Sequence, residues 1–403
     1  MINRKKEKVI FKNLDTDEIL LIKGARQVGK TTLLKRAAAN LKEGDDKVFE
    51  LTLEDPELLN DLNKHPENIF NFIPRSEERI YLALDEIQYL ENPSNFLKYI
   101  FDVYGGKIKL VVTGSSAFYL DTKFKDSLAG RKKVVEIYPF SFSEFLEAKG
   151  ERAMSAEVSQ GFTPGTKRQI LKPERKILHQ YWMEFVQYGG YPRVVLESEP
   201  DEKKELLKEL VQSFLRKDIY ESGIREEEKF YKLVRLLASQ AGQLLNVNEL
   251  ANTLDISKGT VSKYLYVLQK SYIIKICPPF YNNIRKELTK MPKFYFLDTG
   301  YRNSLLNSFE LVGNRIDTGQ VLESSVFTGL VKSGVDDVKY WRTQNRKEID
   351  FIVGRKSAFE VKVSIRKYAP AKYKTFVNAY PDIDLQPVVM FDYENLDVLD
   401  FVS

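Results

Sequence analysis

The most specific chemical signature in the sequence is the octapeptide GARQVGKT, which begins at Gly24. An apolar segment precedes it, and a helical pattern rich in leucine and alanine follows it. Its two glycines let the backbone curl so that successive N–H groups point inward, and the helix N-terminus adds partial positive charge. Such a loop binds phosphate, because Lys30 can reach the β- and γ-phosphates of a nucleotide and the Thr31 hydroxyl can bind Mg²⁺. The predicted nucleotide-binding residues are Gly24, Ala25, Arg26, Gln27, Val28, Gly29, Lys30, Thr31 and Thr32.

A second apolar segment ends in two carboxylates that complete the predicted site. Residues 80–84 are apolar, and Asp85 and Glu86 follow them directly. We expect Asp85 to hold Mg²⁺ together with Thr31, and Glu86 to polarise the attacking water as a general base. The implied cofactors are ATP and Mg²⁺, and the implied reaction is ATP hydrolysis.

The last quarter of the sequence carries another set of charged residues at regular spacing. Its stretch EIDFIVGRKSAFEVKV predicts two short strands joined by a turn. Because side chains alternate along a strand, Glu360 and Lys362 share one face, and the turn brings Asp350 beside them. With Glu323 on a preceding amphipathic helix, these carboxylates are candidate Mg²⁺ ligands, and Lys362 could position a water or stabilise charge on a phosphate. Alternatively, Lys362 pairs with a neighbouring carboxylate and Asp350 is a charge at a strand edge.

Several segments together resemble a family of bacterial and archaeal AAA-type P-loop ATPases with a C-terminal winged helix and a PD-(D/E)XK nuclease-like domain. The similar segments are GARQVGKTTLL, LDEIQ, VTGSSAF, LAGRKKVVEIYPFSFSEFL, YGGYPRVVL and LRKDI. The resemblance implies that Ser115 contacts the γ-phosphate or the attacking water, although a helix N-cap explains Ser115 equally well. It also implies that Arg131 acts as an arginine finger on a neighbouring subunit of a homo-oligomer. A basic strand edge is the alternative for Arg131.

The middle of the chain has the element order of a winged helix. Residues 247–254 predict a short helix, residues 257–270 a longer one, and two strands joined by a basic loop follow. In a DNA-binding version, the second helix enters the major groove and the loop contacts phosphates. The module could instead pack between domains or bind a protein. The candidate DNA contacts are Ser257, Lys258, Thr260, Ser262, Lys263, Arg285, Lys286, Lys290 and Lys293.

Composition limits the class of protein. The chain has 403 residues, of which 43% are hydrophobic and 30% charged, so we expect a globular protein of several domains. Its apolar runs are too short to span a bilayer, and its single cysteine, Cys277, excludes a disulfide framework within the chain. We therefore expect a cytoplasmic protein without a membrane partner. A net charge of +5 permits DNA as a partner without requiring it.

Together these observations predict an α/β protein with a P-loop parallel-sheet ATPase domain, a helical and winged-helix middle, and a C-terminal α/β nuclease-like domain. The predicted function is ATP hydrolysis coupled to work on DNA. The alternative is a nucleotide-gated switch or scaffold that binds a protein partner and has an inert C-terminal domain. The predicted boundaries are 1–150 for the ATPase domain, 151–172 for a polar linker or insertion, 173–245 for the helical region, 246–305 for the winged helix and 306–403 for the nuclease-like domain.

Overall fold

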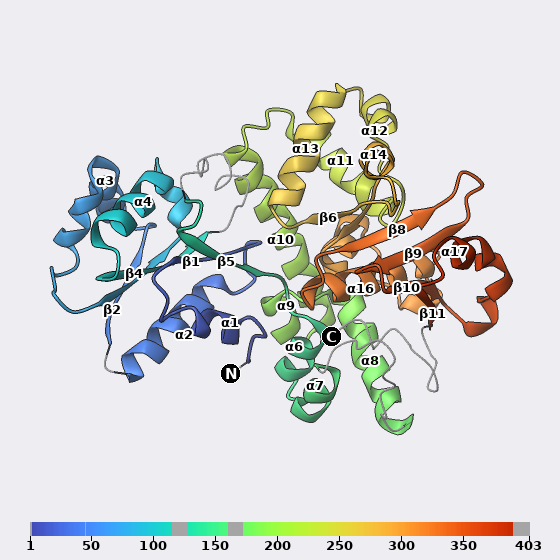
Figure 1. Cartoon of the computed structure of the whole chain (residues 1–403), viewed down its shortest axis with the longest axis horizontal. Coiled ribbons are helices and arrows are strands. Elements are labelled where there is room, and N and C mark those ends of the chain that lie inside the picture. The colour runs from blue at the N-terminus through green and yellow to red at the C-terminus, as the bar shows by residue number, and fades with distance from the viewer. Residues whose placement is uncertain (1, 45, 115–127, 160–171, 390–403) are drawn as a thin grey trace.

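A computed structural model describes residues 2–44, 46–114, 128–159 and 172–389 (Figure 1). Its first part is built on a sheet of five parallel strands in the order β2-β3-β4-β1-β5. The strands are β1 (Ile19–Gly24), β2 (Lys47–Thr52), β3 (Ile80–Asp85), β4 (Ile108–Gly114) and β5 (Lys132–Ile137). Strands β1, β3 and β4 are buried almost throughout, as their continuous apolar runs require in a sheet covered on both faces.

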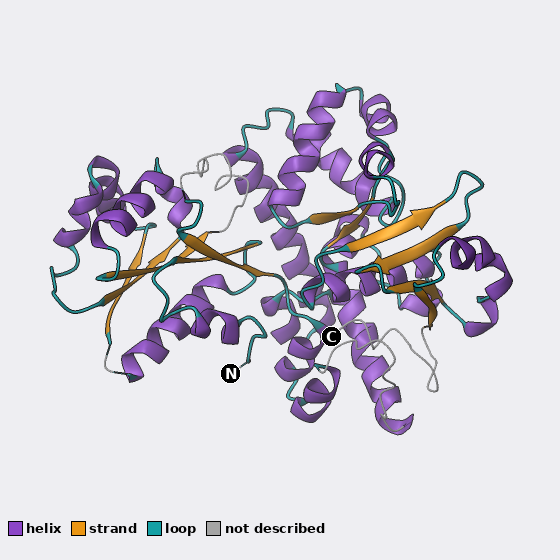
Figure 2. Cartoon of the chain, in the orientation of Figure 1, coloured by secondary structure: helices purple, strands orange, loops and turns teal. Residues whose placement is uncertain are grey.

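Helices cover both faces of this sheet (Figure 2). Alternation along β1 sends Leu20 and Ile22 toward the core shared with α2, and Ile19 and Leu21 toward the opposite core. The elements around the sheet are α1 (Glu7–Lys12), α2 (Lys30–Glu43), α3 (Pro56–Lys64), α4 (Pro93–Tyr104) and the 3₁₀ helices η1 (Pro66–Asn71) and η2 (Ile87–Tyr89).

Helices form the part that follows the sheet. Within the predicted polar linker or insertion at residues 151–172, Arg152–Val158 form a helix, α7, which packs beside α6 and buries Ser155 and Val158. The helices are α6 (Phe142–Ala148), α7 (Arg152–Val158), α8 (Lys172–Tyr188), α9 (Pro192–Leu196), α10 (Pro200–Glu221) and α11 (Glu227–Ser239).

The next segment has the predicted order of helix, turn, helix and hairpin. Asn246 caps α12, Asp255 takes a left-handed conformation (φ 50°) at the turn, and Ser257 caps α13. The predicted loop between the two strands contains a further short helix, α14. The elements are α12 (Val247–Leu254), α13 (Lys258–Lys270), β6 (Ile274–Cys277), α14 (Ile284–Thr289), β7 (Lys293–Phe296) and α15 (Thr299–Leu306).

The C-terminal part is a four-stranded sheet in the order β11-β10-β9-β8. The predicted hairpin is present, since β9 and β10 are antiparallel and join at Gly354, whose φ is 56°. The elements are η3 (Val312–Asn314), α16 (Thr318–Lys332), β8 (Val338–Arg342), β9 (Glu348–Val353), β10 (Ser357–Lys362), η4 (Ile365–Lys367), η5 (Pro370–Tyr373), α17 (Lys374–Ala379) and β11 (Asp384–Val389).

One of the hydrophobic cores connects the parts of the chain. A single cluster of buried apolar side chains runs from β1 and α2 through the middle helices to β10. The β6–β7 hairpin also meets the C-terminal sheet directly, because Phe280 donates its backbone N–H to the Tyr340 carbonyl (2.6 Å). Within the described ranges, no helix is both long and apolar enough to cross a membrane.

Candidate functional site

The octapeptide loop lies between β1 and α2 and lines a pocket of about 450 Å³. Gly29 has a φ of 94°, and a Cβ on Gly24 would lie 2.1 Å from the Ile137 carbonyl oxygen of β5. Both positions therefore require glycine. The Lys30 ammonium donates to the Ala25 carbonyl (2.7 Å) across the loop. This is the curled loop at a helix N-terminus that the sequence predicts.

The two predicted acids at the end of β3 lie beside this loop. Thr31 donates its hydroxyl hydrogen to Asp85 Oδ2 (2.8 Å). Thr113, at the end of β4, donates to Asp85 Oδ1 and accepts from the backbone N–H of Glu86 (3.0 Å). Glu86 has a φ of 59°, a conformation that is uncommon outside glycine and that often occurs at functional sites. Thr113 thus holds both acids in place, a role that sequence reasoning did not assign to it.

Three pocket residues come from helices outside the ATPase sheet. Pro192 and Arg193 begin α9, and Ser213 lies on α10. Arg193 is largely exposed, and its guanidinium lies 3.9 Å from the Glu209 carboxylate. The predicted Ser115 lies outside the described residues. The pocket is lined by Arg26, Gln27, Gly29, Lys30, Thr31, Thr32, Glu54, Glu86, Tyr89, Pro192, Arg193 and Ser213.

Arg4 stabilises the phosphate-binding loop through hydrogen bonds to its backbone and to the segments next to it. Its guanidinium donates to the Val28 carbonyl (2.8 Å), to the Tyr138 carbonyl after β5 (2.7 Å) and to Glu144 of α6 (2.9 Å). The Arg4 side chain is 9% exposed. One buried side chain therefore links the phosphate loop to α6 and to the residue after β5, the edge strand that pairs with β1.

Arg131 makes a two-point ion pair within its own chain. Its Nε and Nη2 contact the two carboxylate oxygens of Asp102 on α4, at 2.7 and 3.2 Å. This geometry is that of a structural arginine–carboxylate pair. A finger role toward another subunit stays a prediction, and it requires Arg131 to leave Asp102.

The C-terminal charged residues also come together. Asp350 on β9 accepts the backbone N–H of Val361 on β10 (2.8 Å). The Lys362 ammonium pairs with Glu360, which also accepts the hydroxyl of Tyr373 (3.0 Å). The alternative in which Lys362 pairs with a carboxylate is therefore the arrangement observed.

Lys293 lies among these acids, which corrects its predicted place in an exposed wing. It begins β7, where its side chain is 3% exposed. Its ammonium contacts Glu323 of α16 (2.8 Å) and Glu348 of β9, and it lies 4.0 Å from Asp350. Tyr295 adds a hydroxyl bond to Glu323. We call Lys293, Glu323, Glu348 and Asp350 the Lys293 cluster.

The pKa shifts reflect this burial and charge. Burial, with the charges of Glu323 and Glu360, raises the pKa of Asp350 well above its usual range. Burial also raises the pKa of Glu360, and the charge of Lys362 only partly opposes that rise. For Lys293, burial lowers the pKa but the surrounding carboxylates outweigh it and raise the pKa. The ammonium is therefore held charged by its neighbours.

A metal role for Glu323, Asp350 and Glu360 stays a prediction. No group of three or more His, Cys, Asp or Glu side chains within the described ranges is placed to hold a metal ion. One buried oxygen, Glu360 Oε2, faces no hydrogen-bond donor of the described chain. A single open oxygen does not make a cation site, and Lys293 already supplies the positive charge.

Comparisons with known proteins agree with the pocket. Residues 16–146 match the family model described as "AAA domain". The match and the pocket together support an AAA-type P-loop ATPase. The remainder of the chain matches two models described as domains of unknown function, DUF8612 over residues 179–311 and DUF4143 over residues 318–400.

The chain is similar over most of its length to curated relatives. An uncharacterized protein of Haemophilus influenzae is 29% identical over 354 residues, which are 84% of this chain and 80% of the relative. An uncharacterized protein of Methanocaldococcus jannaschii is 29% identical over 388 residues, covering 89% of this chain and 80% of the relative. The ATPase domain and the parts that follow it therefore occur together in these relatives.

Solved structures show a more distant likeness. ORC2 of Aeropyrum pernix is 14% identical with a TM-score of 0.40, covering 69% of this chain and 88% of that one. The Holliday junction branch migration motor RuvB of Thermotoga maritima is 15% identical with a TM-score of 0.35, covering 72% and 95%. At these TM-scores, no conclusion about this chain follows from the likeness.

The residues of the ATPase domain fit a magnesium nucleotide. Thr31 and Asp85 place two hard oxygen donors 2.8 Å apart at the edge of the pocket. Mg²⁺ prefers such oxygens and shares its remaining positions with water and phosphate. Lys30 and Arg193 bring positive charge to the same pocket. The donor set is therefore suited to Mg·ATP.

Proposed function

We propose that this protein binds and hydrolyses ATP. The observation that carries the proposal is the hydrogen-bonded set of Thr31, Asp85 and Thr113 beside the Lys30 loop. Lys30 would exchange the Ala25 carbonyl for phosphate oxygens, and Thr31 and Asp85 would hold the Mg²⁺ that offsets phosphate charge. Glu86 lines the pocket, where it can accept a proton from the attacking water.

The helices after the ATPase sheet complete this site. Pro192 and Arg193 of α9 line the same pocket as the loop, so the Arg193 guanidinium can contact a phosphate. Since α9 belongs to the middle of the chain, nucleotide occupancy has a direct route to the C-terminal half. We propose that this contact couples the nucleotide state to the rest of the protein.

The substitution Lys30→Ala tests the ATPase proposal. We expect ATP turnover to fall to background, because the charge that reaches the phosphates is lost. Lys42→Ala is the matched control, since Lys42 lies near the opposite end of α2 and pairs with Glu50 at the surface (2.7 Å). Wild-type turnover in Lys30→Ala would remove the proposal.

We propose that the middle domain is a winged helix and that it binds DNA. The first turns of α13 expose Ser257, Lys258, Ser262 and Lys263. These side chains can contact phosphates or base edges. DNA binding measured with ATP, with ADP and without nucleotide tests the coupling. Equal affinity in all three states would argue against it.

For the C-terminal half, the Lys293 cluster favours the inert C-terminal domain of the alternative function, a nuclease-like fold that does not cleave DNA. A buried lysine supplies the positive charge that metal ions supply in nuclease sites. We expect no Mg²⁺- or Mn²⁺-dependent cleavage of linear, circular or single-stranded DNA. Cleavage by the wild type that Asp350→Ala abolishes would restore the nuclease candidate.

The arginine finger is a further part of the proposal. In an oligomer, Arg131 would exchange Asp102 for the nucleotide of a neighbouring copy. The expected sign is a specific ATPase rate that rises with protein concentration in the wild type and stays flat in Arg131→Ala. A wild-type rate independent of concentration would count against the finger.

A further inference from the structure

A tight turn joins the nucleotide pocket to the rest of the chain at Gly189 and Gly190. Gly189 has a φ of 77°, and a Cβ there would lie 2.0 Å from Asp298 Oδ1. A Cβ on Gly190 would lie 2.4 Å from the Phe140 carbonyl oxygen, and one on Gly300 would lie 2.0 Å from the Tyr188 carbonyl oxygen. The segment at Tyr188–Gly190 and the segment at Asp298–Gly300 therefore approach each other as closely as glycine allows.

Asp298 holds this turn with charge-assisted hydrogen bonds. Its carboxylate accepts the backbone N–H of Gly190 (2.7 Å) and, as the N-cap of α15, the backbone N–H of Tyr301 (2.9 Å). The residue is 4% exposed. Burial raises the pKa of Asp298, and the nearby charge of Lys332 opposes that rise. A buried carboxylate is thus kept between a helix N-terminus and the glycine turn.

Three parts of the chain meet around the turn that Asp298 holds. Gly190 accepts the backbone N–H of Phe140 from the ATPase domain (2.7 Å). The Phe140 carbonyl in turn accepts from the ammonium of Lys332, the last residue of α16 (3.1 Å). We call Phe140, Gly190, Asp298 and Lys332 the Asp298 junction.

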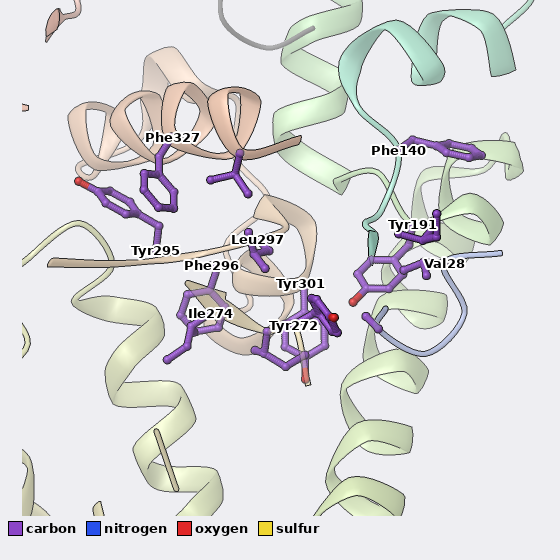
Figure 3. Close-up of a cluster of buried hydrophobic side chains, with 14 of the residues drawn as sticks. Val28, Phe140, Tyr191, Tyr272, Ile274, Tyr295, Phe296, Leu297, Tyr301 and Phe327 are labelled. Carbon is purple, nitrogen blue, oxygen red and sulfur yellow. The ribbon is translucent and has the colours of Figure 1, made fainter. Parts of the chain in front are cut away.

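The turn leads straight into the nucleotide pocket. Tyr191 follows Gly190 and is buried, with its ring 6.3 Å from the ring of Tyr301. Figure 3 shows Tyr191 in one buried cluster with Val28 of the phosphate loop and Tyr301 of α15. The next two residues are Pro192 and Arg193, which line the pocket.

We propose that Asp298 is a positioning residue for the ATPase reaction, which fixes Arg193 at the nucleotide by anchoring the turn from which α9 begins. Because Asp298 also caps α15 and lies near Lys332 of α16, a change at the nucleotide would shift α15 and, through Lys332, the C-terminal half. This proposal rests on the proposed ATPase function and adds the residue that links it to the other domains.

The substitution Asp298→Asn tests the anchor with little change of shape. The KM for ATP should rise about 10-fold, as loss of one charge-assisted hydrogen bond implies, while kcat changes less than about threefold. Arg193→Ala should raise KM similarly, and the double variant should be no worse than Arg193→Ala alone, because both changes remove one interaction. Asn246→Ala is the control, since it removes the N-cap of α12 away from the pocket.

The outcomes separate the two proposals. An unchanged KM in Asp298→Asn, or effects on KM that multiply in the double variant, overturns the role of Asp298. The ATPase proposal still stands in that case, provided that the wild type hydrolyses ATP. A wild type without ATP turnover overturns both. If Asp298→Asn does not fold, Lys332→Gln tests the same junction, because it removes the charge that faces Asp298. It should raise KM in the same direction, and an unchanged KM contradicts the proposal.

Discussion

Replacing Lys293 by methionine removes one positive charge from among three carboxylates while keeping most of the side-chain volume. In the wild type, the ammonium contacts Glu323 and Glu348 and lies 4.0 Å from Asp350. The Lys293 side chain is 3% exposed, so its removal leaves the carboxylates without a cation in a largely buried place. The variant therefore tests whether this lysine is the resident cation of the cluster.

The expected magnitude follows from burial. Breaking a buried ion pair by removing one partner costs roughly 3–5 kcal/mol. The side chains of Glu323 and Glu348 are 16% and 24% exposed, so water can reach them partly, and we expect a value near the lower end. A loss of ~3 kcal/mol corresponds to a fall in Tm of about 6–12 °C for a unit of roughly 150–250 residues.

Thermal unfolding without nucleotide, with and without Mn²⁺, is the assay. Lys42→Met is the control, because Lys42 makes an ion pair of similar length at the surface (2.7 Å) and should change Tm little. We expect Mn²⁺ to raise the Tm of Lys293→Met toward the wild-type value, since the freed carboxylates can then bind a cation. A Tm within about 2 °C of the wild type in Lys293→Met would refute the reasoning.

Three further predictions concern other buried contacts and the DNA surface. Arg4→Ala should cost about 2–3 kcal/mol of unfolding free energy and raise the KM for ATP, because it frees the Val28 carbonyl of the loop and removes the ion-pair partner of Glu144 (2.9 Å). Thermal unfolding measures the first effect and ATP turnover the second. Burial raises the pKa of Asp317, but its two arginine partners outweigh burial and lower the pKa from 3.8 to about 2. The stabilisation that Asp317 contributes by pairing with these arginines is present above about pH 4 and is lost as the pH falls toward 2. In urea unfolding, the excess stability of the wild type over Asp317→Asn should therefore shrink over that range, and a constant difference would contradict the prediction. Replacing Lys258 and Lys263 together by alanine should weaken DNA binding and reduce the slope of log K against log salt by about 2; an unchanged slope would exclude both as phosphate contacts.

The local parts of the nucleotide site could be predicted from the sequence. A phosphate loop is specified by consecutive residues, so Gly24 to Thr31 identify it without knowledge of the fold. Asp85 and Glu86 follow an apolar strand, and parallel strands bring their carboxyl ends to the same edge of the sheet. In the structure Glu86 lines the pocket, and Asp85 accepts the hydroxyl of the pocket residue Thr31 (2.8 Å).

The residues that the sequence could not assign come from distant segments. Arg4 and Arg193 reach the loop through tertiary packing, and spacing within the sequence carries no signal for such contacts. Lys293 follows a run of basic residues and was predicted to be exposed. Its partners Glu323 and Glu348 come from α16 and β9, and only the docking of β7 against them makes the lysine buried.

The central claim is that the loop and the acid pair hydrolyse ATP, and one comparison tests it most directly. ATP affinity and ATP turnover should be measured on the wild type and on Glu86→Gln, which keeps the shape of the side chain but removes the proposed base. We expect both proteins to bind Mg·ATP with similar affinity, and turnover in Glu86→Gln to fall at least about 100-fold. Wild-type turnover in Glu86→Gln, or a wild type that binds no ATP, would contradict the account.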